Sequence, residues 1–368
     1  MRAALAATEA HPRRAGRMPQ DMDRLTALLH GRRSRMAEDE RLDDFCRARC
    51  LADLWEKTFP GWEARDHLRF QRLVTEELVS ELSGILASLS GAGARLLHWV
   101  LVRFQFEDLK LLIRTGLTGS PQAEALEHLV SLPPEVAIDV QGLMAAEWLE
   151  DFIELAPPGV VRKCLKKTVE SYREHPQPFF FEAILDQGYF QELLSRAEHL
   201  PSRERCILEP LLFQEIDIFN LMLVARGRFH YGLSHDLLVP LYVAGTRFHR
   251  WIFFDMLKDK DLRSSAGRVA SLLFDSPLPE AGPNEGPEAG ALNPAILERF
   301  AWRRFIRLAN RAFRQSHMGL ASVFGYISLR RMEVANLITL SEGVRKGMPA
   351  DVIRSRMVTY GEQGGPHV

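Results

Sequence analysis

The chain has 368 residues, of which 46% are hydrophobic, so it is long enough to bury a sizeable core in two or three domains of ordinary size. Its 47 basic and 48 acidic residues give a formal net charge of −1, which provides no whole-chain field to hold nucleic acid or an anionic bilayer and favours protein partners. No apolar run approaches the roughly 18 residues needed to span a membrane, so the sequence predicts a soluble or peripheral protein.

The first segment, residues 1–23, is predicted to be a disordered tail. Its hydrophobic stretch is too short for a secretory signal and ends with a charge at Glu9. Four cysteines are too few for a disulfide scaffold in a chain of this length, which indicates a reducing compartment. Cys46 and Cys50 have the i, i+4 spacing of half a metal site, but no His or Cys pair completes it, so packing as small hydrophobes is favoured.

Helical periodicity dominates the rest of the chain. Leu212, Ile216, Phe219 and Leu223 fall at i, i+4, i+7 and i+11, which is one apolar stripe of a helix. Valine, isoleucine and threonine do not alternate with polar residues for long enough to indicate a strand. The sequence therefore predicts an all-α fold.

One short pattern occurs three times, with its central residues Asp108, Asn220 and Asn336 spaced by 112 and 116 residues. Each copy has a polar pair three residues apart on one helix face, then a leucine, then a glycine that is predicted to end the helix in the left-handed conformation. The copies are Gln105/Asp108, Leu109 and Gly119; Asp217/Asn220, Leu221 and Gly232; and Glu333/Asn336, Leu337 and Gly347.

A period this long exceeds the 20–50 residues of solenoid repeats, so each copy is expected to belong to a small domain. We expect helical units at residues 24–130, 131–247 and 248–368, in a pseudo-threefold arrangement. Residues 276–293, rich in proline, glycine and glutamate, are predicted to form a flexible acidic loop in the third unit. A solvated linker is favoured over a contact with a basic partner surface.

The second copy combines Asn220-Leu221 with Arg226 and Gly232-Leu233-Ser234. This pattern resembles the C (or d) subunit of the rotary V/A-type ATPases, and the resemblance covers residues 25–360. The first copy departs from it at Asp108, where asparagine is expected, and the third departs at Glu342, where arginine is expected.

The resemblance implies a non-catalytic central-stalk subunit built as a funnel of three helical units. Its partners would be the proteolipid (c/K) ring at the bottom of the funnel and the central shaft subunits, whose foot would occupy the cavity. The protein would then be peripheral, on the cytoplasmic face of the membrane, with no cofactor and no nucleic acid bound.

The polar pairs of the motif have two interpretations. They are either buried groups that fix the docking of the units, which is favoured, or a socket for another subunit. The same alternatives apply to Arg114 and Arg226, near the ends of their helices, where cations also meet the helix dipole favourably. Arg228, two residues after Arg226, is a further candidate contact with an acidic partner.

A basic amphipathic helix is predicted over residues 298–314, with Arg303, Arg307 and Arg311 in one row. Its row of arginines could contact an acidic partner or lipid headgroups, although a solvated face is favoured.

The sequence has no phosphate-binding loop, no dinucleotide-binding glycine motif, no His-Glu-x-x-His and no Gly-x-Ser-x-Gly. We therefore expect no ATP hydrolysis, no cofactor and no metal site in this chain. The alternatives to a rotary coupling protein are a helical adaptor unrelated to rotary ATPases and an all-α enzyme, and the latter would need a pocket with converging acid and base groups.

Overall fold

In the computed structural model, the described residues are 18–118, 121–146, 149–174, 178–275, 277–278, 292–315 and 319–359, and every regular element in them is a helix. The predicted all-α fold class is confirmed. None of the helices in these ranges is long and apolar enough to cross a membrane. Most of the predicted loop at 276–293, and Gly119 of the first motif, lie outside the described residues.

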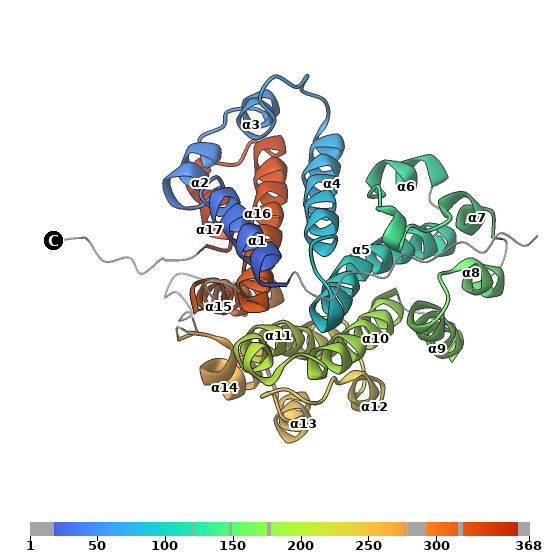
Figure 1. Ribbon diagram of the computed structural model, residues 1–368. Coiled ribbons are helices and arrows are strands. Elements are labelled where there is room, and N and C mark those ends of the chain that lie inside the picture. The colour runs from blue at the N-terminus through green and yellow to red at the C-terminus, as the bar shows by residue number, and fades with distance from the viewer. Residues whose placement is uncertain are drawn as a thin grey trace, which may run out of the picture.

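Three pairs of long helices form the framework, and the second helix of each pair carries one copy of the motif (Figure 1). The pairs are α4 (His67–Leu86) with α5 (Gly91–Thr118), α10 (Pro178–Glu198) with α11 (Ser202–Met222), and α15 (Pro294–Gln315) with α16 (Leu320–Arg345). Local chemistry sets several of these ends: the Asp66 side chain accepts a hydrogen bond from the backbone N–H of Arg69 and caps α4.

A short helix follows each motif helix and returns the chain along it. These are α6 (Gln122–His128), α12 (His235–Leu238) and α17 (Ala350–Arg356). In the second unit, α11 continues directly into the π-helical turn η2 (Leu223–Arg228) before the chain reverses.

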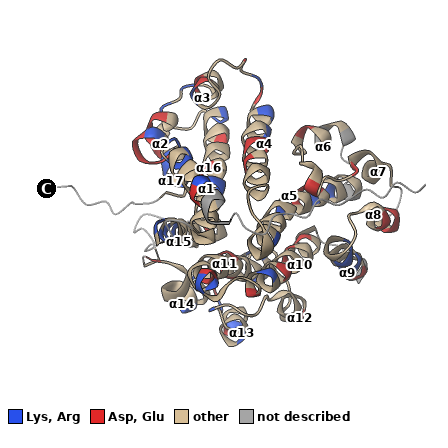
Figure 2. Cartoon of the chain, viewed as in Figure 1, with Lys and Arg blue, Asp and Glu red and all other residues tan. Residues whose placement is uncertain are grey.

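The remaining helices cover the outside of the framework. They are α1 (Met18–Arg33), α2 (Asp39–Cys46), α3 (Leu51–Thr58), η1 (Pro134–Val136), α7 (Val140–Ala145), α8 (Leu149–Leu155), α9 (Val160–Glu174), η3 (Val239–Leu241), α13 (Arg250–Lys258) and α14 (Leu262–Leu273). Helix α1 begins at Met18, inside the segment 1–23 for which a disordered tail is predicted. Basic residues are concentrated on α9 and acidic residues on the neighbouring α8 (Figure 2).

The two ends of the described chain pack together. Figure 1 shows the blue helices α1–α4 beside the red helices α16 and α17, and α4, α1 and α3 all contact α16. Arg354 of α17 pairs with Asp43 of α2 at 2.8 Å, and the thiol of Cys46 lies 3.7 Å from the sulfur of Met357. The segment before α4 is therefore a spatial neighbour of the third motif, although it is distant from it in sequence.

One connected hydrophobic core runs through the helix pairs. The leucine of each motif is buried in it, with exposed fractions of 0% for Leu109, 0% for Leu221 and 3% for Leu337. Helices α15 and α16 approach closely at Gly325, where an added Cβ would lie 2.5 Å from the backbone nitrogen of Phe313. A larger residue at Gly325 would force these two helices apart.

Candidate functional site: contacts repeated among the three motif helices

The three motif helices meet at one buried charge cluster. Arg103 of α5, Glu215 of α11 and Arg331 of α16 each lie five residues before the central residue of their motif. Arg331 binds Glu215 through two hydrogen bonds, Nη2 to Oε1 at 2.6 Å and Nη1 to Oε2 at 3.1 Å. Arg103 Nη1 lies 3.7 Å from the same Oε1. One residue from each motif copy thus joins a single junction, which we call the central triad.

The central triad is stabilised by its own charges. Glu215 is 4% exposed, and although this burial by itself would raise the pKa of its carboxyl, Arg331 and Arg103 hold that pKa below its usual value. The guanidinium of Arg103 also lies over the rings of Tyr189 and Phe190, at 5.2 and 5.5 Å from their centroids. Removal of one partner would leave a buried charge uncompensated.

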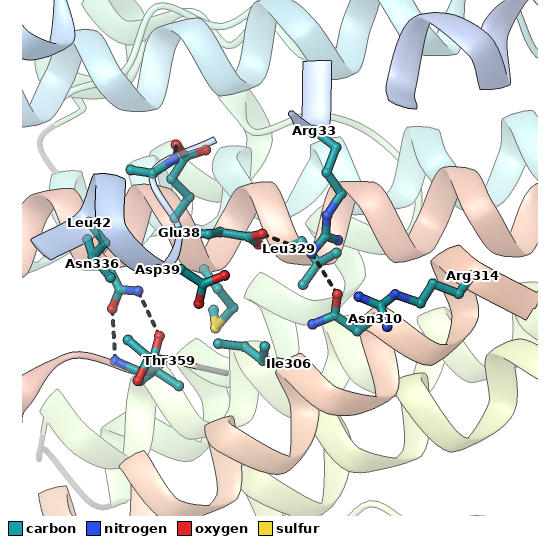
Figure 3. A pocket seen from close by; sticks show the side chains of 14 residues that line it. Arg33, Glu38, Asp39, Leu42, Ile306, Asn310, Arg314, Leu329, Asn336 and Thr359 are labelled. Carbon is teal, nitrogen blue, oxygen red and sulfur yellow. Dashed lines mark hydrogen bonds and ion pairs between the residues drawn. The ribbon is translucent and has the colours of Figure 1, made fainter. Parts of the chain in front are cut away.

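A second repeated contact joins the central motif residue to a valine that follows the short return helix, and we call it the clasp. The Asn220 side chain donates from Nδ2 to the carbonyl of Val243 at 2.9 Å and accepts from the N–H of Val243 at 3.0 Å. Asn336 makes the same two bonds with Val358, at 2.7 and 2.9 Å (Figure 3). Each amide thus pairs with both the N–H and the carbonyl of its valine.

The first unit has a clasp with one bond. The N–H of Val130 donates to Oδ1 of Asp108 at 3.3 Å. The partner valine lies 22 residues after Asp108, 23 after Asn220 and 22 after Asn336, so the three positions correspond. Burial raises the pKa of Asp108 to about 7.

The first members of the polar pairs are buried in three different ways. Gln105 donates to the carbonyl of Val136 at 3.1 Å, and Glu333 accepts from the N–H of Ala37 and pairs with Arg330 at 2.7 Å. Asp217 is 2% exposed, and burial raises its pKa to about 7.

Glycine ends two of the motif helices. Gly347 has a φ of 62°, its N–H donates to the carbonyl of Val344, and the N–H of Met348 donates to Gly343, which is a Schellman motif. Gly232 has a φ of 67°, and the N–H of Leu233 donates to the carbonyl of Gly227 across the π-helical turn. Both positions are in the left-handed region that favours glycine.

A third repeated contact links each motif helix to the next helix pair, and we call it the latch. Arg114 pairs with Glu182, and Arg226 pairs with Glu298. In the third copy, Glu342 accepts a hydrogen bond from Gln71 at 2.8 Å. The first member lies six residues after the central motif residue, and the second is the fifth residue of α10, α15 or α4. The third latch connects the last motif helix back to the first pair.

The other arginines selected from the sequence lie at the end of η2 and on α15. Arg228 Nε donates to the carbonyl of Leu257 at 3.4 Å, and Arg303 lies over the ring of Phe300 at 5.3 Å. Arg307 pairs with Asp275, and Arg311 is exposed. The sequence-based selection missed the central triad and the second members of the latches, although fixed offsets from the motif and from the helix starts locate them.

A cavity of about 150 Å³ lies between α1, the start of α2, α15 and α16, beside the third clasp (Figure 3). The Arg33 guanidinium, which points into it, donates to Asn310 at 2.6 Å and to Glu38 at 2.9 Å. Within the described ranges, no three His, Cys, Asp or Glu side chains are grouped so that they could hold a metal ion.

The family of ATP synthase (C/AC39) subunits has a model that matches residues 25–356 of this chain. The chain belongs to this family.

Curated relatives carry a consistent name. The chain is 24% identical over 260 residues to the C subunit of the A-type ATP synthase of Methanothermobacter thermautotrophicus, and 20% identical over 262 residues to that of Methanosphaera stadtmanae. Each match covers 70% of this chain and 66% of the relative. A match to the Methanobrevibacter smithii protein of the same name is 22% identical over 255 residues, 68% of this chain and 65% of the relative. The matched region is thus slightly less than two thirds of these relatives.

In this C/AC39 family member, both residues that depart from the expected motif, Glu342 and Asp108, still make the contact of their position. Glu342, which replaces the expected arginine, faces Gln71, whereas Arg114 and Arg226 face Glu182 and Glu298. The change in one latch member is therefore matched by a change in the other. Asp108, which replaces the expected asparagine, keeps one bond of the clasp.

Proposed function

We propose that the chain is a non-catalytic central-stalk subunit of a rotary V/A-type ATPase, which couples the soluble shaft to the membrane proteolipid ring during ATP-linked ion transport. Membership of the C/AC39 family and the names of its relatives support a place in such a complex. In this proposal the chain is peripheral to the cytoplasmic face of the membrane, and it reaches the membrane through its protein partners.

The three latches carry the proposal. Transmission of torque requires a stiff body with a large interface and needs no reactive group. The third latch joins Glu342 to Gln71 of α4, in the helix pair that contains the first motif helix. The three contacts therefore form a closed cycle. Together with the central triad, this cycle supports a pseudo-threefold, funnel-like arrangement of three units near residues 24–130, 131–247 and 248–368.

We place the contacts with partner subunits on charged residues that take no part in a latch. Arg114 and Arg226 are occupied by latches, so their main role is to join units. Exposed Arg311, in the same row of α15 as Arg303 and Arg307, is the better candidate for contact with an acidic partner protein. Rim charges of this kind affect association rate and salt dependence.

The test is affinity purification of the tagged chain from detergent-solubilised membranes, followed by identification of the bound proteins by mass spectrometry. The proposal expects the proteolipid and at least one shaft subunit. Copurification without either of them, from membranes that contain an assembled ATPase, would favour a helical adaptor instead. The same purification with Arg311→Glu, compared with wild type over a series of salt concentrations, measures whether α15 contributes to binding of the partners.

A further inference from the structure

The three clasps differ in the atom that faces the valine carbonyl. In the second and third clasps, the Nδ2 of Asn220 or Asn336 donates to that carbonyl. In the first clasp, the N–H of Val130 donates to Oδ1 of Asp108. The other carboxyl oxygen, Oδ2, therefore corresponds to the Nδ2 atom of the two asparagines. An ionised carboxylate only accepts hydrogen bonds, whereas a protonated one has an O–H to donate.

We propose that Asp108 is a proton-binding site, in which the protonated Oδ2 donates to the carbonyl oxygen of Val130 and closes the first clasp in the same way as the two asparagine clasps. The proton replaces the N–H of an amide, and no bond between heavy atoms forms or breaks. The inference rests on the correspondence of the three clasps and does not depend on the partners of the chain.

The surroundings of Asp108 favour its neutral form. The side chain is 4% exposed, and burial, assisted by the charge of Glu107 on the same helix, raises its pKa to about 7. The N–H of Val130 and the charge of Arg72 on α4 act in the opposite direction. Arg72 is itself paired with Glu76 at 2.7 Å, so its charge is largely compensated.

Other neighbouring charges are engaged elsewhere. Lys110, two residues along α5, binds Asp186 of α10 and lies 3.2 Å from Glu107. On the α6 side, Ser131 donates from its N–H and its hydroxyl to Glu76. Among the described residues, the polar group bonded to Asp108 is the backbone N–H of Val130.

The composition of the motif pairs agrees with a neutral Asp108. Each pair contains one acid and one amide, but the order is reversed in the first unit, where Gln105 is the amide and Asp108 the acid. The clasp position is an amide in the other two units and is an acid only in the unit whose first pair member, Gln105, is an amide. A protonated Asp108 gives all three clasp positions the same hydrogen-bonding capacity.

The proposal is tested by comparing the unfolding of wild type and Asp108→Asn in denaturant as a function of pH. A proton held more tightly by the folded chain stabilises wild type fully below pH 3.8, and this stabilisation is lost as pH rises to about 7. Relative to Asp108→Asn, the unfolding equilibrium constant of wild type should increase about tenfold per pH unit within that window. Asp217 is present in both proteins, so its contribution cancels.

Two further measurements complete the test. Asp351→Asn removes an exposed carboxyl from α17 and should not reproduce the pH-dependent difference. The infrared band of a protonated carboxylic acid should weaken in Asp108→Asn below pH 7. A wild-type to Asp108→Asn ratio that does not change with pH, an unchanged infrared band, or failure of Asp108→Asn to fold would each overturn the proposal, because it requires asparagine to be an equivalent residue at this position.

Discussion

Gln71 Nε2 donates a hydrogen bond to Glu342 Oε1 at 2.8 Å, and this contact joins the first helix pair to the last motif helix. The two residues are 271 positions apart in the chain. The corresponding contacts, Arg114 with Glu182 and Arg226 with Glu298, join consecutive units. The Gln71–Glu342 contact instead joins the last unit to the first. It therefore closes the three latches into a cycle.

Substitutions at Gln71 should change stability in opposite directions. Gln71→Glu places a second carboxylate against Glu342 and should lower the free energy of unfolding by about 0.2–1 kcal/mol, because the contact is partly exposed. Gln71→Lys faces Glu342 with a cation and should preserve or slightly raise stability. Urea denaturation at low salt measures both. Equal effects of the two variants would mean that Gln71 and Glu342 do not interact in solution.

Loss of the acid at the central triad should be far more costly. Glu215→Gln leaves Arg103 and Arg331 close together without their buried counter-charge, so we expect a loss of about 3–5 kcal/mol. The matched control is Glu209→Gln on the same helix, where the pair with Arg205 is exposed. A Glu215→Gln protein as stable as Glu209→Gln would contradict the assigned role of the triad.

Asp217 should make stability fall with increasing pH. Burial raises its pKa from 3.8 to about 7, so the folded chain binds the proton more tightly than the unfolded chain. Its stabilising contribution is complete below pH 3.8 and is lost as pH rises to about 7. In Asp217→Asn the free energy of unfolding should therefore decrease less with pH across this window than in wild type. A steeper fall in Asp217→Asn than in wild type would show that Asp217 is ionised in the folded state.

The helices could be predicted from the sequence more completely than the contacts between them. Period and spacing identified the all-α class and placed the motif on three helices, because apolar periodicity and glycine stops are local signals. The second latch members were missed, since Glu182 and Glu298 belong to other helices and are recognisable only once the pairs are docked. The packing of α1–α3 on α16 and α17 was also missed, because nothing local in residues 18–58 encodes a contact with the far end of the chain.

The arginines illustrate the same limit. For Arg114 and Arg226 the sequence leaves two roles open, joining the units, which it favours, or contacting another subunit, and in the structure each has a carboxylate from another helix of the same chain as its partner. A charge pattern in sequence indicates that a cation needs a partner, but it does not indicate whether that partner lies in the same molecule.

The most direct test of a coupling role is ATP-driven ion pumping by membrane vesicles from cells that lack this chain, measured beside ATP hydrolysis by the soluble head. We expect pumping to be abolished while hydrolysis by the released head is largely retained, because only the mechanical link is removed. Restoration of pumping by the wild-type chain is the control. Unchanged ATP-driven pumping in the absence of the chain would show that it does not couple the shaft to the ring.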